Sequence, residues 1–343
     1  MLRGAAFGPL TARWPFRPTI ASPTADIRRR PRRRTTMAPT NRIGIVFNPS
    51  KSERGELERA IADATDLPVT WHETSVDDPG VAATREALEA RADLVIAAGG
   101  DGTVRAVCEH LAESGADVEL GIVPLGTGNL LARNLGVPLG SIRAAVTRAL
   151  TGEPRTIDAA WAETDRTRHA FVVMAGFGID AHMITETDDD LKSRAGWLAY
   201  VESLGRALSA SDVVELTLTV GEESPETHHA HTLIVGNCGT LQGGITLLPD
   251  ADPSDGALDL IVLDASDASG WADTVKNVVW DNGVGRIFRK SDRAASSQSV
   301  THAQLTSLDI ELEEPRVFEV DGDDVGEVTR VRISVQPEAI RVR

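Results

Sequence analysis

The chain has 343 residues, of which 41% are hydrophobic and 25% are charged, so it is long and apolar enough to fill two domains. It contains no run of the roughly 18 apolar residues that a membrane-spanning helix needs, and its net charge of −16 argues against nucleic-acid binding by the folded body. Two cysteines are too few for a disulfide framework and are compatible with a reducing, cytoplasmic location.

The charge is unevenly distributed along the chain. Residues 1–36 contain nine arginines and one acid, a net charge of +8, and subtracting this from the total of −16 leaves −24 for the remainder. Lysine occurs only four times. An acidic surface with almost no lysine is typical of proteins from concentrated salt, which screens the self-repulsion, so we expect a halophilic source.

The basic segment 1–40 is Pro- and Arg-rich and is predicted to be disordered. Arg28–Arg34 could bind anionic lipid electrostatically or belong to a twin-arginine export signal, although no apolar region follows. The interpretation we favour is that translation starts at Met37, because high salt would weaken an electrostatic anchor.

Residues 41–153 alternate predicted strands and helices, which predicts a parallel, doubly wound α/β sheet. The predicted strands lie near Ile43–Phe47, Pro68–His72, Leu94–Ala98 and Leu120–Val123. The predicted helices lie near Glu53–Thr65, near Val81–Arg91, from Thr103, from Asn129 and over Ser141–Leu150. Ligand-binding loops in such sheets follow the carboxyl ends of the strands, where Asn48 and Thr74 occur.

A glycine-rich loop follows the third predicted strand and precedes a helix. Its sequence is Gly-Gly-Asp-Gly-Thr over residues 99–103, and the helical spacing of Val104, Val107 and Leu111 makes Thr103 the predicted N-cap. Glycines there let phosphate oxygens approach the main-chain N–H groups of a helix start. The loop matches neither a Walker A motif nor a dinucleotide fingerprint, and a simple Asx turn is the competing interpretation.

Asp101 is the unusual member of this loop. A carboxylate beside a triphosphate is repulsive unless a cation intervenes, so Asp101 suggests Mg²⁺, bound directly or through water.

From about Pro154 the sequence changes to alternating strands with glycine or acidic turns, which predicts a mostly antiparallel β domain. The predicted strands are His169–Ala175, Val213–Val220, Ala230–Gly236, Leu258–Leu263, Ser307–Leu312, Arg316–Val320 and Thr329–Val335. One helix with an apolar face is predicted at Arg194–Ala210; packing on the sheet is the favoured interpretation and membrane contact the alternative.

The ordered motifs of this chain resemble those of the diacylglycerol kinase catalytic-domain family, which includes bacterial lipid kinases and sphingosine kinases. These motifs are Asn48-Pro49, Gly99–Thr103, Pro124–Arg133, Ala175–Ala181, Gly236-Asn237, Gly243-Gly244, Pro249, Asp255–Asp259 and Asp321-Gly322-Asp323. The similarity covers about residues 42–343. It implies an NAD kinase- or phosphofructokinase-like α/β domain over residues 41–153 and a lipid-binding β-sandwich over residues 154–334, with residues 335–343 returning to the first domain.

The resemblance implies a kinase that uses ATP and Mg²⁺ to phosphorylate the hydroxyl of a membrane lipid at the inner face of the membrane. The lipid would be diacylglycerol-, dialkylglycerol- or sphingoid-like. Candidate ATP-binding residues are Asn48, Thr74, Gly99, Gly100, Asp101, Gly102, Thr103, Gly126, Thr127 and Asn129.

The resemblance also suggests roles for two sets of carboxylates. Asp321 would accept the proton of the lipid hydroxyl, and Asp323 stands where the family usually has Glu. The side chain of Asp255, with the carbonyls of Asp252 and Ala257, would hold a structural Mg²⁺, since hard oxygen ligands suit that ion. An Asp-Gly turn without metal, and an acidic hairpin turn over Val320–Gly326, are the competing interpretations.

Three further questions stay open at this stage. An NAD kinase-like enzyme shares the Gly-Gly-Asp-Gly loop, and a nucleotide-binding regulatory protein without catalysis is suggested by Asp323 in place of Glu. Arg105 departs from the family, which often has Asn or Glu soon after the Gly-Gly-Asp-Gly-Thr run, and it could pair with a phosphate or be solvated on its helix. A homodimer is compatible with the sequence.

Overall fold

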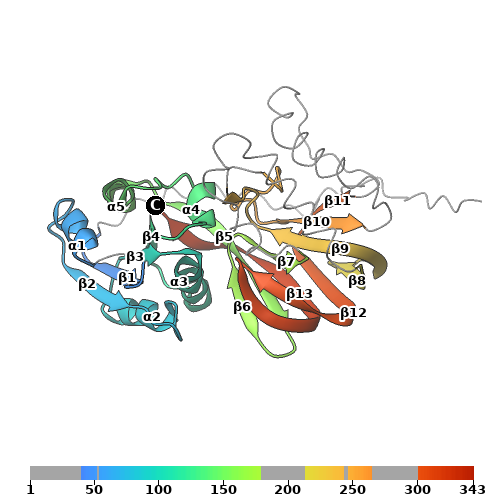
Figure 1. Cartoon of the computed structure of the whole chain (residues 1–343). Helices are drawn as coiled ribbons and strands as arrows, with labels where there is room; N and C mark the ends of the chain where they lie inside the picture. The colour runs from blue at the N-terminus through green and yellow to red at the C-terminus, as the bar shows by residue number, and fades with distance from the viewer. Residues whose placement is uncertain (1–39, 52–53, 179–212, 243–245, 265–299) are drawn as a thin grey trace, which may run out of the picture. The chain divides into compact units, whose positions relative to one another are not determined.

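The structure is a computed structural model that describes residues 40–51, 54–178, 213–242, 246–264 and 300–343 (Figure 1). The basic tail, the helix predicted at Arg194–Ala210 and the Gly243-Gly244 motif therefore lie outside the described residues. Among the described residues, no helix is both long and apolar enough to cross a bilayer.

A parallel sheet forms the first half of the fold, with its strands in the order β4-β3-β1-β2. These strands are β1 (Ile43–Phe47), β2 (Val69–Glu73), β3 (Leu94–Gly99) and β4 (Glu119–Pro124). The uninterrupted apolar runs of β1 and β3 are fully buried because helices cover both faces of the sheet. The predicted doubly wound sheet is confirmed.

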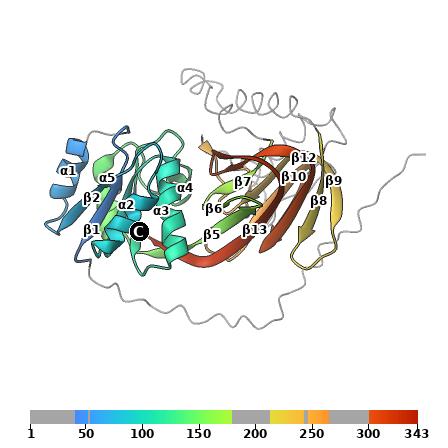
Figure 2. The same ribbon diagram turned by 90° about the horizontal axis from the view of Figure 1, so that it is seen from below.

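Five helices accompany these strands. They are α1 (Arg54–Ala62), α2 (Val81–Glu89), α3 (Asp101–Ser114), α4 (Leu130–Asn134) and α5 (Ile142–Thr151). Helices α1 and α5 lie on one face of the sheet, whereas α2 and α3 lie on the other, in front of the strands in Figure 2.

Helix α3 begins earlier than the sequence predicts. Its N-cap is Gly100, not Thr103, and its first residue is Asp101. The Thr103 side chain folds back over Gly99, where a β-carbon on the glycine would lie 2.6 Å from the Thr103 Cβ. Gly99 is therefore required by the packing of its own helix, and Thr103 is only 3% exposed.

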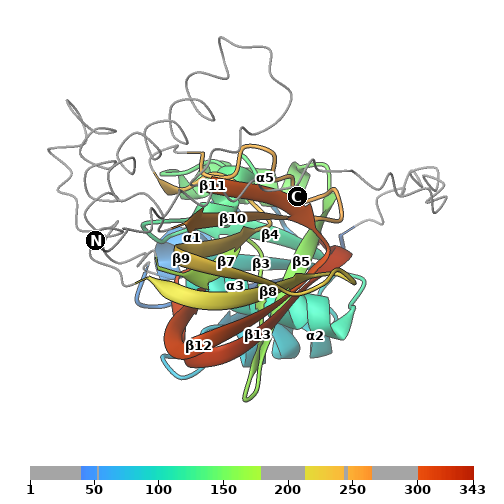
Figure 3. The same ribbon diagram turned by 90° about the vertical axis from the view of Figure 1, so that its right-hand side faces the viewer.

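The second half is an antiparallel sandwich, as predicted. Its strands are β5 (Arg155–Thr164), β6 (Arg168–Phe171), β7 (Met174–Phe177), β8 (Val214–Val220), β9 (Glu226–Gly236), β10 (Leu258–Asp264), β11 (Val300–Leu305), β12 (Ser307–Val320) and β13 (Asp323–Val342). Strand β9 lies between β8 and β10 (Figure 3). Phe171, Phe177 and Phe318 belong to the buried core between these strands.

The sandwich corrects several strand predictions. Strands β5 and β11 were not predicted, and β5 lacks the usual alternation because six consecutive residues from Ile157 to Ala162 are buried. The predicted strands Ser307–Leu312 and Arg316–Val320 are one strand, β12, whose register against β13 shifts between Glu311 and Arg316. Pro315, which has no N–H to donate to a ladder, lies within this shift.

Strand β13 belongs to both halves of the fold. It pairs with β12 at its start and with β5 along most of its length, and Arg341 and Val342 pair in parallel with β4. A register shift near Glu338 bends the strand, and the buried Asp158 carboxylate accepts the Glu338 N–H at 2.7 Å. One continuous sheet thus runs from the sandwich into the α/β half.

The end of β13 is held by a buried ion pair. The Arg343 guanidinium binds the carboxylate of Glu119 on β4, and the two side chains are 2% and 8% exposed. Arg343 also donates to the Leu150 carbonyl at 2.7 Å and to the Thr40 hydroxyl at 2.9 Å. Removing one partner of such a pair leaves an uncompensated buried charge.

We expect Arg343→Ala to lower the free energy of unfolding by about 3–5 kcal/mol, because Glu119 would stay buried without its partner. Denaturant unfolding measures this loss. Arg341→Ala is the matched control, because Arg341 pairs with Asp117, whose side chain is 91% exposed, and such a pair contributes at most about 1 kcal/mol. Equal losses in the two variants would contradict a special role for the buried pair.

Candidate active site

The predicted nucleotide loops meet at one edge of the parallel sheet. Leu125, just beyond β4, donates its N–H to the Gly99 carbonyl at 2.8 Å, which joins the ends of β3 and β4. A β-carbon on Gly126 would lie 2.6 Å from the Gly100 Cα. The two loops therefore touch backbone to backbone, and this close approach explains the glycine at position 126.

Asp101 links the two loops through its side chain. Its carboxylate accepts the N–H groups of Asn129 at 2.7 Å and Leu130 at 2.6 Å, at the start of α4. A β-carbon on Gly128 would lie 2.7 Å from this carboxylate. Asp101 thus places its negative charge at the positive end of α4, which stabilises the second loop.

Asn129 shapes the second loop rather than pointing away from it. It adopts φ = 48°, a left-handed conformation that Asn tolerates better than most residues. Its side-chain oxygen accepts the Gly126 N–H at 2.9 Å, and its amide donates to the Gly126 carbonyl at 2.5 Å. Thr127, at the tip of the same loop, is exposed.

Asn48 and Thr74 lie beyond the ends of β1 and β2, on the same sheet edge as the glycine loops. Main-chain bonds of 3.0 Å join Asn48 to Ala98 and Thr74 to Phe47. Thr74 is only 7% exposed. The Asn48 side chain accepts both the N–H and the hydroxyl of Ser50, as an Asx turn does.

The Asp321-Gly322 pair forms the tight turn of the β12–β13 hairpin. Both residues have positive φ, 50° and 87°, as a type I′ turn requires. The sequence predicts one catalytic site for Asp321 and Asp323, but their carboxylates do not point at a common site. Instead, each carboxylate binds a different segment of the chain.

The Asp321 carboxylate binds three consecutive main-chain donors. It accepts the N–H groups of Val172, Val173 and Met174, each at 2.9 Å. These bonds break the strand predicted over His169–Ala175 into β6 and β7, because the N–H groups between them face Asp321 instead of a neighbouring strand. Asp321 is 6% exposed, and burial raises its pKa to about 6 although the three hydrogen bonds and Arg105 oppose that shift.

Asp323 binds Arg105 on α3. The Nε and Nη2 atoms of Arg105 donate to the Asp323 Oδ2 at 3.0 and 2.8 Å. A β-carbon on Gly102 would lie 3.6 Å from this carboxylate, so the hairpin tip lies against the first turn of α3. Arg105 is 12% exposed and therefore is not solvated on its helix. The two positions at which the chain departs from the family pattern are thus in contact.

The proposed structural metal loop is also rich in internal bonds. The Asp255 carboxylate accepts the Ala257 N–H at 2.9 Å and the Gln304 amide at 3.1 Å. Burial raises the pKa of Asp255, and Asp252 and Asp158 raise it further. Within the described ranges, no group of three or more His, Cys, Asp or Glu side chains is arranged to hold a metal ion.

Sequence reasoning missed two parts of this site. The main-chain donors of Val172–Met174 leave no signature in residue types, so nothing in the sequence could have identified them. Glu109, which binds Arg105 at 3.2 Å, follows it by one helical turn. That i, i+4 spacing of Arg and Glu is a signal for an ion pair that the sequence analysis did not use.

Comparisons with known proteins agree with the resemblance drawn from the ordered motifs. Residues 43–162 match the diacylglycerol kinase catalytic domain, and residues 172–343 match the YegS C-terminal NAD kinase beta sandwich-like domain. The chain is 32% identical to the "Probable lipid kinase YegS-like" protein of Pectobacterium atrosepticum, over 87% of this chain and 94% of the relative. It is 30% identical to the protein of the same name from Stenotrophomonas maltophilia, over 88% and 96%.

The chain belongs to the diacylglycerol kinase catalytic-domain family. A crystal structure of a diacylglycerol kinase from Bacillus anthracis str. Sterne has the same fold, with a TM-score of 0.63 at 22% identity over 89% of this chain and 97% of that chain. The resemblance drawn from the ordered motifs is confirmed, and with it the assignment of this family member to the lipid kinases.

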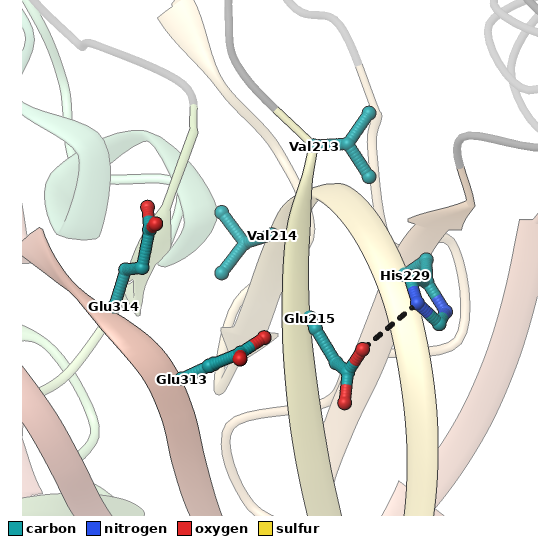
Figure 4. Close-up of a pocket in the computed structure, with 6 residues that line it drawn as sticks. All are labelled: Val213, Val214, Glu215, His229, Glu313 and Glu314. Atoms are coloured by element: carbon teal, nitrogen blue, oxygen red, sulfur yellow. Dashed lines mark ion pairs between the residues drawn. The ribbon is translucent and has the colours of Figure 1, made fainter.

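A separate pocket of about 260 Å³ lies on the sandwich of this family member (Figure 4). It is lined by Val213, Val214, Glu215, His229, Glu313 and Glu314. Glu215 and His229 form an ion pair of 3.1 Å across adjacent strands. None of the predicted site residues lines this pocket, so it has no part in the site described above.

We expect Gly126→Ala to lower the free energy of unfolding by about 1–3 kcal/mol, because the new methyl group would meet the Gly100 backbone at 2.6 Å. Urea unfolding measures the change. Gly55→Ala on α1 is the matched control, since no atom lies within 4 Å of its added β-carbon, and it should raise stability by up to ~1 kcal/mol. If Gly126→Ala leaves the free energy of unfolding unchanged, the two loops can move apart without cost.

Ionisation of Asp321 is expected to make the protein less stable as the pH rises from about 4 to about 7. A carboxyl group with a raised pKa in the folded state favours folding fully below its unfolded pKa, and this contribution is lost as the pH rises through about 6. Moving the pKa from 3.8 to about 6 corresponds to about 3 kcal/mol.

The measurement is urea unfolding of the wild type and Asp321→Asn across this pH range. The stability of the wild type relative to the variant should fall by that amount as the pH rises. A difference that stays constant with pH would show that Asp321 titrates as an ordinary exposed carboxylate.

Proposed function

We propose that the protein transfers the γ-phosphoryl group of ATP to the hydroxyl of a membrane lipid at the inner membrane surface. A diacylglycerol-like lipid is the first candidate, and an ether-linked dialkylglycerol or a sphingoid-like lipid the next. The lipid kinase class follows from the family. The observation that supports the proposed chemistry is the contact of Asp323, on the same hairpin tip as Asp321, with the start of α3.

The start of α3 would bind the phosphates of ATP. A helix N-terminus presents N–H groups without intrahelical partners and a partial positive charge. Gly99, Gly100 and Gly102 belong to this start, and the exposed Thr127 lies in the loop that touches it. Asn48 and Thr74, on the same sheet edge, would contact the nucleotide.

Asp321 would accept the proton of the lipid hydroxyl. Among the described residues, its Oδ1 accepts two main-chain N–H groups and its Oδ2 accepts one, so Oδ2 would keep a lone pair for an incoming hydroxyl. A pKa of about 6 leaves the carboxylate ionised at neutral pH and yet basic enough to accept a proton during transfer.

Mg²⁺, when bound, would neutralise phosphate charge during the transfer. Both oxygens of Asp101 accept main-chain N–H groups, so this carboxylate fits contact with the ion through water better than direct contact. A second Mg²⁺ would have a structural role on the loop that contains Asp252, Asp255 and Ala257.

A labelled-ATP transfer assay in high salt with Mg²⁺ and a mixed lipid panel tests this function. The wild type should put label into a chloroform-soluble product. Asp321→Asn should reduce the rate by about 10²–10⁴-fold, the usual contribution of a general base. Asp324→Asn is the matched control, because Asp324 is exposed on the same hairpin and its carboxylate accepts the nearby Gly326 N–H.

The other outcomes separate the alternatives. NAD is included as a competing acceptor, and label in NADP would identify an NAD kinase-like enzyme with the same nucleotide loop. Binding of ATP without transfer to any acceptor would favour a nucleotide-binding regulatory protein. Enzymes usually bind their substrates with KM values of up to about 1 mM. If ATP does not bind at about 1 mM, both the kinase and the nucleotide-binding regulator are contradicted.

A further inference from the structure

We infer that Arg105 is a positioning residue for the phosphoryl transfer proposed above, because it fastens the Asp321–Asp323 hairpin tip to the start of α3 through its contact with Asp323 and supplies a positive charge near Asp321. The inference deepens the proposed function and rests on it for its kinetic part. It concerns a residue of α3 that none of the motifs identified in the sequence includes.

The first support is the geometry of the Arg105–Asp323 contact. Two guanidinium nitrogens donate to one carboxylate oxygen, at 3.0 and 2.8 Å, and this contact joins residues 218 positions apart in the chain. The Arg105 side chain is 12% exposed and Asp323 is 46% exposed. Arg105 is thus the buried member, and Asp323 covers it from the outer side.

The second support is the contact on the other side of Arg105. Its Nη1 atom donates to the Glu109 Oε2 at 3.2 Å, and the same oxygen accepts the Ala170 N–H of β6 at 3.0 Å. Arg105 therefore lies between two carboxylates that face different strands, β13 and β6. A guanidinium suits this position because its fork of donors is rigid and planar.

These contacts close a ring around the hairpin tip. From Asp321 the ring passes to the main chain of Val172, along β6 to Ala170, across to Glu109 and Arg105, and back through Asp323. Each hydrogen bond in the ring has a donor–acceptor distance of 3.2 Å or less. Loss of Arg105 would open the ring on the α3 side, and the Asp321 carboxylate would keep only its bonds to the main chain of residues 172–174 within this ring.

The charges around Asp321 give Arg105 a second role, in the ionisation of the Asp321 carboxyl group. Arg105 and Cys108 of α3 and Cys238 of the segment after β9 face Asp321, and burial raises the pKa of both thiols, which keeps them neutral. Arg105 lowers the pKa of Asp321 and so favours its ionised form.

One further titratable group lies near the ring. His169 of β6 faces Glu109, Arg105 and Asp323, and burial lowers its pKa, which keeps it neutral at pH 7. Without Arg105, the carboxylates of Asp321, Asp323 and Glu109 would share this region with no positive charge between them. Like charges in one site raise the pKa of a carboxyl group.

Four variants test the inference: Arg105→Gln, Arg105→Lys, Asp323→Asn and the double variant Arg105→Gln/Asp323→Asn. Arg105→Gln should lower kcat by about 10–100-fold and leave KM for ATP nearly unchanged. In the pH profile of kcat/KM, the fall in activity on the acid side (the acid limb) should move to a pH about one unit higher. Arg105→Lys keeps the positive charge but loses the planar pair of guanidinium donors. The acid limb should therefore stay at the wild-type pH, and kcat should be partly reduced. The double variant should lose no more kcat than Arg105→Gln, since both changes break one contact.

Arg143→Gln is the matched control, because Arg143 on α5 makes an exposed ion pair with Asp63 away from the site. It should leave kcat and the pH profile unchanged. If Arg105→Gln loses stability but keeps the wild-type kcat and acid limb, Arg105 is a structural residue only and the inference is wrong.

A readout without turnover separates this inference from the proposed function. The ionisation of Asp321 can be followed by infrared difference spectroscopy in the wild type and in Arg105→Gln. The carboxyl band of Asp321 is identified as the one that disappears when Asp321→Asn is introduced. If the wild type transfers no phosphoryl group, the proposed function fails. The charge part of the inference then stands if Arg105→Gln raises the pKa of Asp321, and it is overturned if the pKa does not move.

Discussion

Backbone pairing along β13 is the constraint on which the rest of this structure depends. The strand begins at the hairpin that carries Asp321 and Asp323, runs beside β5 through the sandwich, and ends in parallel register with β4. The glycine loops follow β3 and β4 directly. A single strand therefore connects the carboxylates of the candidate site with the sheet that positions the glycine loops, and hydrogen bonds rather than a flexible linker define how the two parts are arranged.

The site itself is organised by carboxylates that bind main-chain N–H groups. Asp101 binds the start of α4, Asp321 binds the segment between β6 and β7, and Asp158 binds the bend of β13. In each case the charge satisfies donors that no strand or helix could satisfy. Hydrogen bonds from main-chain N–H groups explain how this chain, which is rich in Asp and Glu, can bury some carboxylates without a cation beside each one. It also means that a carboxylate in a recognised motif can have a structural contact and a chemical role together.

The sequence predicted those parts of the protein that local patterns determine. Unbroken apolar runs identified the parallel strands, and the glycine motifs identified both loops of the candidate site. The contact of Arg105 with Asp323 was beyond reach because it joins segments 218 residues apart, and nothing local indicates that pairing. The broken strand between Phe171 and Met174 was missed because its cause, the Asp321 carboxylate, comes from the other end of the chain. Thr103 was misplaced as an N-cap because a Thr before an apolar helical repeat satisfies the same local rule as a true cap.

The pairing of β4 with the end of β13 has a consequence for how the chain folds during synthesis. Glu119 on β4 meets Arg343 across 224 residues of sequence, so the ribosome makes β1 to β4 long before their last neighbour exists. Until then β4 is an open edge of a four-stranded sheet, and open edges invite pairing with other chains. The Glu119 carboxylate also lacks its arginine until then, and a charge without a partner is costly to bury. The last residues of β13 thus close the open edge and neutralise the buried carboxylate in one step, so the first sheet is complete only when the whole strand has been made.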